Sequence, residues 1–388
     1  MAAVTAILAG KVGGAVQQAS RNRAAGWWYD PHMAAASRAI AERTPLVDLI
    51  LEVRDARVGY HIPLSSQFDQ LKDQPPSSKR VIVLNKMDLA NGAEVKEWMS
   101  YMEHQKQICY GVNSHNRDNI KKFLNFLQAH MRQLKKIDYS SSTITMMLVG
   151  VPNVGKSALA NSLHKVGRVG AAEKGKLKHA TVSPLPCETK DISSFKIASN
   201  PNVYVLDTPG ILPPVINETE ICSKLALTGT IRDSLVGEKE LAMYFLSMLN
   251  SSEEYKKWAE LSSAQTGRML ADCEAACANR EPIVICYAMG FNGFKSGSKQ
   301  IQDFIVDDVR RTLYEEASSF QRKLAKSKDC MRLIELQLEA LPEAFRVPLE
   351  FGDDSFVKVS KKLLNLYRTG RLGHYTLDSV PNHSHLIL

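Results

Sequence analysis

A glycine-containing loop between an apolar run and a helical stretch constrains the fold of this chain more than any other feature. Residues 144–150 read ITMMLVG, and residues 150–157 read GVPNVGKS. The pattern GxxxxGK[ST] after a strand forms a loop whose backbone N–H groups surround a phosphate. Lys156 would reach the β- and γ-phosphates, and the Ser157 hydroxyl would bind Mg²⁺. A plain glycine turn is the alternative, but the strand, loop, Lys-Ser pair and helix together favour the phosphate site.

A second motif that can contact phosphate, DTPG at 207–210, follows the apolar run NVYVL. Asp207 ends a predicted strand and can hold Mg²⁺ through water. The amide of Gly210 can contact the γ-phosphate and register its loss on hydrolysis. DTPG alone is a common turn. After a phosphate loop, it indicates the second half of a nucleoside triphosphate site.

The motif NKMD at 85–88 selects the base. The Asp88 carboxylate can accept hydrogen bonds from N1–H and the 2-amino group of guanine, and adenine lacks both donors. Asn85 would bind the base and brace the neighbouring loop, and the Lys86 stem would lie across the ring. A strand-ending turn is the alternative. An ATP-using P-loop enzyme would leave Asp88 idle, so the three motifs together predict GTP and GDP as ligands.

Continuous apolar runs alternate with helical stretches through the first part of the chain. Runs without polar alternation are typical of parallel strands covered on both faces, and they occupy 45–58, 80–88, 107–114, 144–150 and 202–210. Helical spacing marks 31–44, 93–106 and 118–136. We predict an α/β P-loop domain over 26–230, with a mainly parallel sheet and helices on both faces, followed by an all-α C-terminal domain at 231–388.

The first 25 residues are predicted to be a transit peptide or a disordered tail. Residues 1–29 carry Lys11, Arg21 and Arg23 and no acidic residue, a composition typical of organelle targeting. The start of a first helix is the alternative. No apolar run is long enough to cross a bilayer, so we expect no integral membrane segment. Lys and Arg outnumber Asp and Glu by 49 to 41, which is compatible with a polyanionic partner.

The order of the motifs is unusual, because the base-reading motif precedes both phosphate motifs. In this order the sequence resembles the circularly permuted ribosome-assembly GTPases, in the branch of the bacterial large-subunit assembly GTPase, its mitochondrial relatives and the plant DAR GTPases. The matching segments are DAR (55–57), NKMD, GVPNVGKS, DTPGIL (207–212), LALTGTIRD (225–233) and RTGRLGHYTLD (368–378). The loops of one parallel sheet keep their places when chain order changes, so permutation is physically plausible.

Ile211 stands where Ras-like enzymes have a water-orienting glutamine, and it cannot orient water by hydrogen bonding. The resemblance therefore implies a GTPase with a slow intrinsic rate. It also implies that ribosomal subunits stimulate this rate. The implied GTP-binding residues are Asn85, Lys86, Asp88, Asn113, Ser114, Asn153, Val154, Gly155, Lys156, Ser157 and Gly210. The implied catalytic residues are Lys156, Asn153, Thr189 and Gly210, and Ser157, Thr189 and Asp207 would bind Mg²⁺. The resemblance also places a K⁺ ion at Asn153, for which simple loop geometry is the alternative.

Three departures from the family pattern bear on Thr189 and the N-terminus. The usual PGHM is DPHM at 30–33, and Cys187 or Glu188 stands where a glycine usually precedes the switch threonine. The insertion between Ser157 and Thr189 is also long. It contains a basic stretch at 165–180 that would either face RNA or be solvated.

A second basic segment, near the C-terminus, bears on the choice of partner. The stretch 355–377 has no acid; its cations are Lys358, Lys361, Lys362, Arg368 and Arg371, above the apolar Phe356, Val359, Leu363, Leu366 and Tyr367. Such a helix could bind rRNA phosphates or be an ordinary solvated face. We predict a monomeric assembly factor for the large ribosomal subunit in mitochondria, with plastid or cytoplasm as alternatives. The rival is a regulatory GTP-binding protein that acts on protein partners without ribosome contact.

Overall fold

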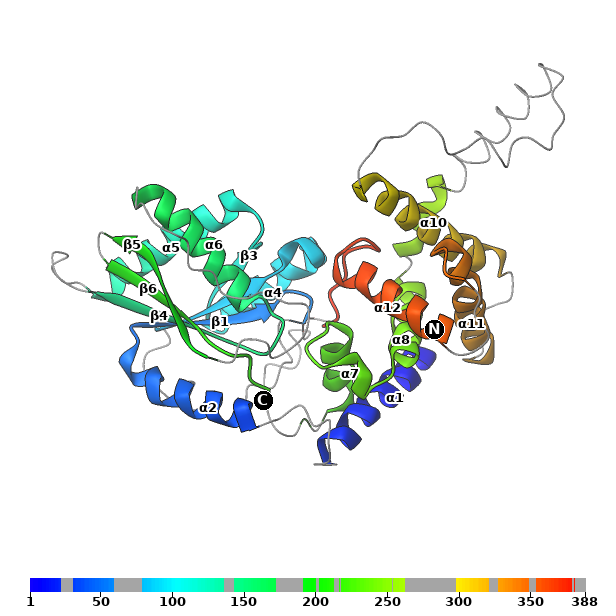
Figure 1. The fold of residues 1–388 in the computed structure, drawn as a ribbon, viewed down its shortest axis with the longest axis horizontal. Coiled ribbons are helices and arrows are strands. Elements are labelled where there is room, and N and C mark those ends of the chain that lie inside the picture. Colours follow the sequence, from blue (N-terminus) through cyan, green and yellow to red (C-terminus); the bar gives the residue numbers. More distant parts are fainter. Residues whose placement is uncertain are drawn as a thin grey trace, which may run out of the picture. The chain divides into compact units, whose positions relative to one another are not determined.

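Two compact units make up the chain in a computed structural model (Figure 1). The residues that the structure describes are 1–21, 31–58, 79–135, 143–171, 191–199, 202–212, 216, 218–252, 254–261, 298–320, 327–348, 354–378 and 380. The sheet unit comprises Val12–Val236 and His374–Leu388, and the helical unit comprises Met1–Lys11 and Gly237–Gly373. The division therefore differs from the predicted 230/231 boundary, and the last residues return to the sheet unit.

A six-stranded sheet with the order β3-β2-β1-β4-β6-β5 forms the centre of the sheet unit. The strands are β1 (Leu49–Asp55), β2 (Arg80–Asn85), β3 (Ile108–Val112), β4 (Ile144–Val149), β5 (Ser193–Ser199) and β6 (Asn202–Asp207). All neighbours pair in parallel except β5, which pairs antiparallel with β6. The predicted parallel strands are confirmed. Strand β5 was missed, because only Phe195 and Ile197 in it are buried.

Helices cover both faces of this sheet, as predicted. Helices α2 (Pro31–Arg43) and α4 (Gly92–His104) pack on the face that carries Ile50 and Ile82. Helices α5 (Arg117–Lys135) and α6 (Lys156–Ala171) lie on the other face, where Tyr110 packs against Phe123 of α5. Figure 1 shows α2 and α6 on opposite sides of the strands.

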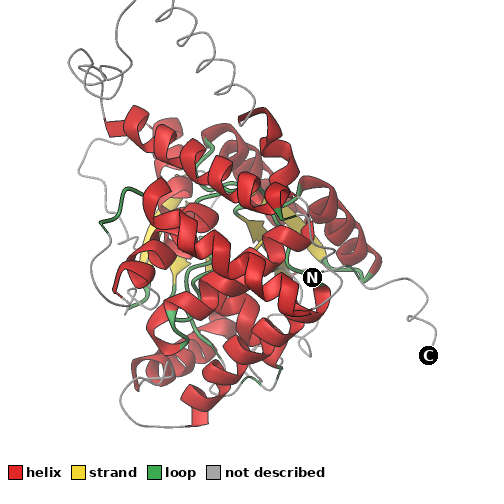
Figure 2. Ribbon diagram, turned by 90° about the vertical axis from the view of Figure 1, so that its right-hand side faces the viewer, coloured by secondary structure: helices red, strands yellow, loops and turns green. Residues whose placement is uncertain are grey.

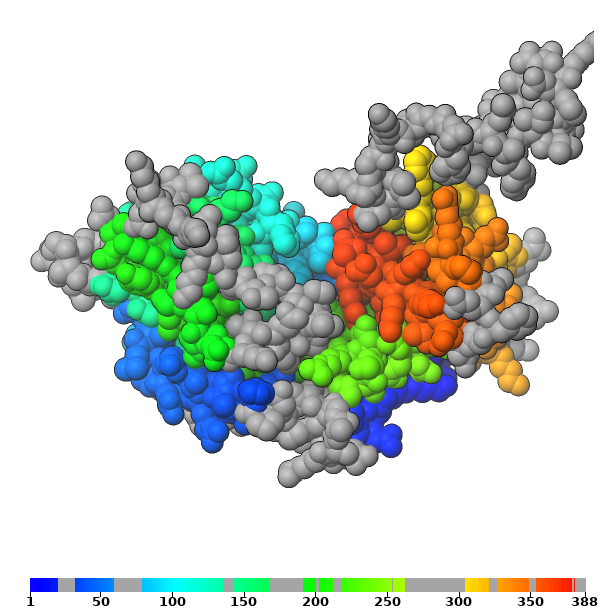
Figure 3. Space-filling model, in the orientation of Figure 1, coloured from blue at the N-terminus to red at the C-terminus, as the bar shows by residue number. Residues whose placement is uncertain are grey.

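The described part of the helical unit contains no strand. Figure 2 draws helices in red and strands in yellow. Its long helices are α8 (Glu238–Ser252), α10 (Ser298–Ser319), α11 (Ser327–Ala344) and α12 (Asp354–Arg368). In its core Phe245 of α8 packs against Tyr367 of α12. Asn250 and Gln337 exchange two buried amide hydrogen bonds, at 2.8 and 3.1 Å. Figure 3 shows α11 and α12, orange to red, side by side.

The N-terminal residues form helix α1 (Ala2–Arg21), whose apolar side chains Val4, Leu8, Val12 and Val16 are buried. Residues 2–21 thus form a helix in this structure. Among the helices that the structure describes, none has the length and apolar character needed to cross a membrane.

Candidate nucleotide-binding site

Four predicted nucleotide loops emerge from the same edge of the sheet. NKMD follows β2, the Asn113-Ser114 loop follows β3, the glycine loop follows β4, and DTPG follows β6. All four strands run in the same direction, because β3 pairs in parallel with β2, β2 with β1, β1 with β4, and β4 with β6. Their carboxyl ends therefore share one edge of the sheet. The permuted chain order therefore leaves the loops together in space.

The glycine loop is closed around the ammonium group of Lys156. Lys156 Nζ donates hydrogen bonds to the carbonyl oxygens of Gly150 and Val151, at 3.0 and 2.9 Å. Lys156 is also the first residue of α6, so the positive end of a helix dipole faces the loop. Gly155 has φ 94°, and a Cβ there would collide with Asn85 Nδ2. This geometry suits a bound phosphate group.

Ser157 and Asp207 lie together, as the prediction of a shared Mg²⁺ site requires. Ser157 Oγ donates to Asp207 Oδ2 at 2.7 Å. Burial raises the pKa of Asp207, and the Ser157 hydroxyl and the Lys156 charge offset that shift only partly. Asp207 Oδ1 is buried without a hydrogen-bond partner among the described residues. A hydroxyl and a buried carboxylate with an unused oxygen fit the oxygen donors that Mg²⁺ prefers.

The DTPG segment is attached to the glycine loop. Thr208 Oγ1 donates to the carbonyl oxygen of Leu148 at 2.6 Å, and the Ile211 amide donates to Gly150 O at 3.3 Å. A Cβ on Gly210 would collide with the backbone of Pro152. Only glycine therefore allows this close approach of the DTPG segment to the phosphate loop.

The side chain of Asn85 joins the base loop to the phosphate loop. Its Nδ2 donates to Val154 O at 2.8 Å, and Ser114 Oγ donates to its Oδ1 at 2.8 Å. Ser162 of α6 in turn donates to Ser114 O at 2.7 Å. The structure thus brings Asn85, Val154 and Ser114 together. The Asn113 side chain instead contacts its own loop, where its Oδ1 accepts a hydrogen bond from the His115 amide at 2.8 Å.

Asp88 lies in the short helix η3 (Met87–Leu89) and is exposed. Lys86, which precedes this helix, has φ 62° and donates from Nζ to Asn153 O at 2.5 Å. Asn153 itself has φ 60°, and its Nδ2 donates to Gly229 O at 2.7 Å. The segment LALTGTIRD, matched only by resemblance at first, therefore contacts the phosphate loop directly.

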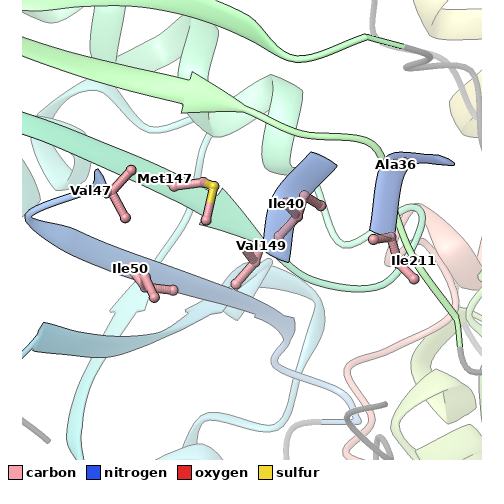
Figure 4. Packing of buried hydrophobic residues seen from close by; sticks show 7 residues of the cluster. All are labelled: Ala36, Ile40, Val47, Ile50, Met147, Val149 and Ile211. Carbon is pink, nitrogen blue, oxygen red and sulfur yellow. The ribbon is translucent and has the colours of Figure 1, made fainter. Parts of the chain in front are cut away.

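Ile211 is turned into the core of the sheet unit (Figure 4). It packs in one cluster with Ala36 and Ile40 of α2 and with Met147 and Val149 of β4. A side chain held in this apolar cluster has no group that could orient water. The prediction that Ile211 cannot replace a catalytic glutamine agrees with its position.

The predicted switch residue Thr189 lies outside the described residues, as do residues 172–190 generally. The basic stretch at 165–180 is therefore described only in its first part, where 165–171 end helix α6.

A functional feature that the sequence analysis missed is the docking of the C-terminal segment on the base loop. The Tyr375 amide donates to Leu89 O at 3.3 Å, directly after NKMD. The Leu377 amide donates to Arg57 O at 2.7 Å, in the DAR segment. The motif RTGRLGHYTLD was matched by resemblance, but no local pattern in it indicated these contacts.

Asp378 ends this docked segment and is buried. Its backbone oxygen accepts from Trp98 Nε1 of α4 at 3.2 Å. Its carboxylate pairs with Lys224 of α7 (Thr219–Leu227) at 3.1 Å, and Lys224 also pairs with Glu220. Asp378 is thereby fixed to the helix that follows DTPG.

Comparison with known proteins agrees with this geometry. The family model "50S ribosome-binding GTPase" matches residues 145–274. The chain is 53% identical to "DAR GTPase 2, mitochondrial" of Arabidopsis thaliana, over 96% of this chain and 95% of that protein. It is 40% identical to "Short integuments 2, mitochondrial" of the same plant, over 91% and 89% of the two chains. It is 29% identical to "Ribosome biogenesis GTPase A" of Bacillus pumilus, over 61% and 79%. The chain belongs to the DAR GTPase family, whose nucleotide-binding motifs stand in circularly permuted order.

Proposed function

We propose that this GTPase is a mitochondrial assembly factor for the large ribosomal subunit and acts on rRNA as a nucleotide-dependent switch. The observation that carries the proposal is the convergence of Asn85, Lys156 and the Ser157–Asp207 pair at one sheet edge. Relatives of the chain carry ribosome biogenesis or mitochondria in their names. GTP and GDP, with Mg²⁺, are its ligands.

The site residues divide into three groups by role. Asp88 reads the guanine edge, Lys86 covers the ring, and Asn85, Asn113 and Ser114 support the base loop. Asn153, Val154, Gly155, Lys156, Ser157 and Gly210 bind the phosphates. Ser157 and Asp207 hold Mg²⁺, and Thr189 closes on the same ion when GTP is bound.

Hydrolysis is slow in the free protein because Ile211 offers no polar group to the attacking water. Lys156 and the Gly210 amide stabilise charge on the phosphates, and a K⁺ ion bound at Asn153 adds positive charge. The GTPase rate measured in K⁺ and then in Na⁺, with and without large subunits, tests this. Equal GTPase rates in K⁺ and Na⁺ would contradict the K⁺ site at Asn153 but would leave the rest of the proposal standing.

The surface for rRNA is the exposed side of α12. Val359, Leu363 and Tyr367 are buried in the helical unit, while Lys358 and Lys361 are exposed. Lys361 lies 3.3 Å from Glu238, a partly exposed ion pair that contributes little energy and therefore would not prevent contact with a phosphate. This arrangement supports an anionic partner over an ordinary solvated face.

Cosedimentation with large mitochondrial subunits tests the ribosome proposal. We expect binding with a non-hydrolysable GTP analogue, release with GDP, and weaker binding as salt rises. The double variant Lys358→Gln and Lys361→Gln should release about two counterions fewer on binding, so the slope of log affinity against log salt should become shallower. Lys96→Gln, which changes an exposed lysine of α4, should leave this slope unchanged. Free migration in every nucleotide state would favour the regulatory protein without ribosome contact.

Location and oligomeric state complete the proposal. The chain acts in mitochondria as a monomer. The acid-free residues 1–25 form the targeting segment, although Val4 and Val12 are buried as in a retained helix. N-terminal sequencing of the protein from purified mitochondria distinguishes removal of this segment from its retention.

A further inference from the structure

The carboxylate of Asp55 lies at the sheet edge between the base loop and the phosphate loop. Strand β1 pairs with β2 on one side and with β4 on the other. Asp55 is the last residue of β1 and is in register with Asn85, the first residue of NKMD. Only 3% of its side chain is exposed. A buried carboxylate at this place must be satisfied by polar or charged groups close to it.

The ammonium group of Lys86 joins Asp55 to the phosphate loop. Lys86 Nζ lies 2.9 Å from Asp55 Oδ2 and 2.5 Å from Asn153 O. The backbone of Lys86 is left-handed, with φ 62°, a conformation that a residue with a Cβ adopts only when its surroundings enforce it. These two contacts fix the far end of the side chain, and with it the path of the four-carbon stem.

Arg57 fixes the orientation of Asp55 in turn. Its Nε and Nη2 donate to the two carboxylate oxygens at 3.0 and 2.8 Å, and its backbone amide donates to Oδ1 at 3.1 Å. A guanidinium that contacts both oxygens sets the plane of the carboxylate as well as its position. Burial alone would raise the pKa of Asp55, but Arg57 and Lys86 hold it well below its usual range. Asp55 is therefore charged at neutral pH.

We propose that Asp55 is a positioning residue for guanine binding, which holds Lys86 so that its stem lies against the base, and that Arg57 orients Asp55 for this role. The inference rests on the proposed function of NKMD in guanine binding. The competing explanation is an ion pair that stabilises the end of β1 and does nothing for the nucleotide. Glu52 offers a matched control, because it is another buried carboxylate of β1, paired with Arg54 and Arg80, on the opposite face of the strand.

The test measures binding of GDP with a fluorescent ribose label, in Mg²⁺, and competition by unlabelled GDP and IDP. Asp55→Asn should weaken GDP binding about tenfold or more, the size of one charge-assisted hydrogen bond. The ratio of GDP to IDP affinity should not change, because Asp88 still reads the 2-amino group that IDP lacks. Glu52→Gln should bind GDP within about twofold of the wild type, whatever its stability.

A double-mutant cycle separates positioning from general destabilisation. Lys86→Met should weaken binding as much as Asp55→Asn, and adding Asp55→Asn to Lys86→Met should cause no further loss. Additive losses, or wild-type binding by Asp55→Asn, would overturn the inference. If Asp55→Asn does not fold by circular dichroism, Lys86→Met decides alone, since wild-type affinity in that variant excludes any action through Lys86. Failure of the wild type to bind GDP would instead reject the proposed function.

Discussion

Lys224 Nζ lies 3.1 Å from Asp378 Oδ1, and this buried ion pair joins the helix after DTPG to the docked C-terminal segment. Both residues belong to the sheet unit, although they are 154 positions apart in sequence and Gly237–Gly373 of the helical unit lie between them. The same C-terminal segment contacts Leu89 and Arg57 through its backbone. One short segment therefore touches the base loop, the DAR segment and α7.

Loss of this ion pair should destabilise the sheet unit. Lys224→Met removes the cation beside a buried carboxylate, and we expect the free energy of unfolding to fall by about 1–3 kcal/mol. Asp378→Asn should cost less, because Lys224 keeps its contact with Glu220 at 2.6 Å. Chemical denaturation followed by far-UV circular dichroism measures both losses. Lys96→Met, which changes an exposed lysine, is the control. An equal loss of unfolding free energy in this variant would show that the effect does not come from the buried ion pair.

Acid should destabilise the sheet unit through two buried carboxyl groups. Burial alone would raise the pKa of Glu52, but Arg54 and Arg80 lower it below its usual value, and Asp55 behaves likewise. A lowered carboxyl pKa stabilises the fold above the usual pKa, and this stability is lost as pH falls through the folded value. The free energy of unfolding should therefore drop below about pH 4.

The control for this acid effect is Glu52→Gln, which has one titrating carboxyl fewer. Its unfolding free energy should vary less steeply with pH than that of the wild type below about pH 4. Denaturant titrations at several pH values give both slopes. Identical slopes would show that Glu52 contributes nothing to the acid transition.

Asp88→Asn should remove the preference for guanine. An amide cannot accept both hydrogen bonds from N1–H and the 2-amino group, so GDP affinity should fall on the order of 100-fold. GDP and IDP should then bind about equally, as competition against labelled GDP would show. Asp118→Asn, another exposed carboxylate near a helix start, should leave GDP affinity unchanged. Unchanged GDP affinity in Asp88→Asn would remove Asp88 from the site.

Ile211→Gln should not create a faster enzyme. The position faces Ala36 and Ile40 in an apolar cluster, so a buried amide should cost about 2 kcal/mol or more in stability. Ile211→Val, which keeps an apolar side chain, should cost about 1 kcal/mol. Thermal unfolding gives the stability, and single-turnover hydrolysis gives the rate. A tenfold gain in rate for Ile211→Gln would show that the side chain reaches the nucleotide.

The sequence predicted those parts of the site that depend on local chemistry. The loops NKMD, GVPNVGKS and DTPG each follow a continuous apolar run, and such runs form parallel strands whose carboxyl ends meet. The juxtaposition of Asn85, Lys156 and Ser157 with Asp207 was predictable for that reason. The edge strand β5 was not, because its short, half-buried sequence carries no strong periodic signal.

By itself, the sequence determined the ligand class and the permuted order of the loops, since both reside in short motifs whose chemistry is local. Only the tertiary structure decided which partners Asp55 and Asp378 have. Each pairs with a residue of another element: Asp55 with Lys86 of the neighbouring loop, and Asp378 with Lys224 of α7. Ion pairs between residues remote in sequence leave no periodic trace in the chain, so packing alone brings these charges together.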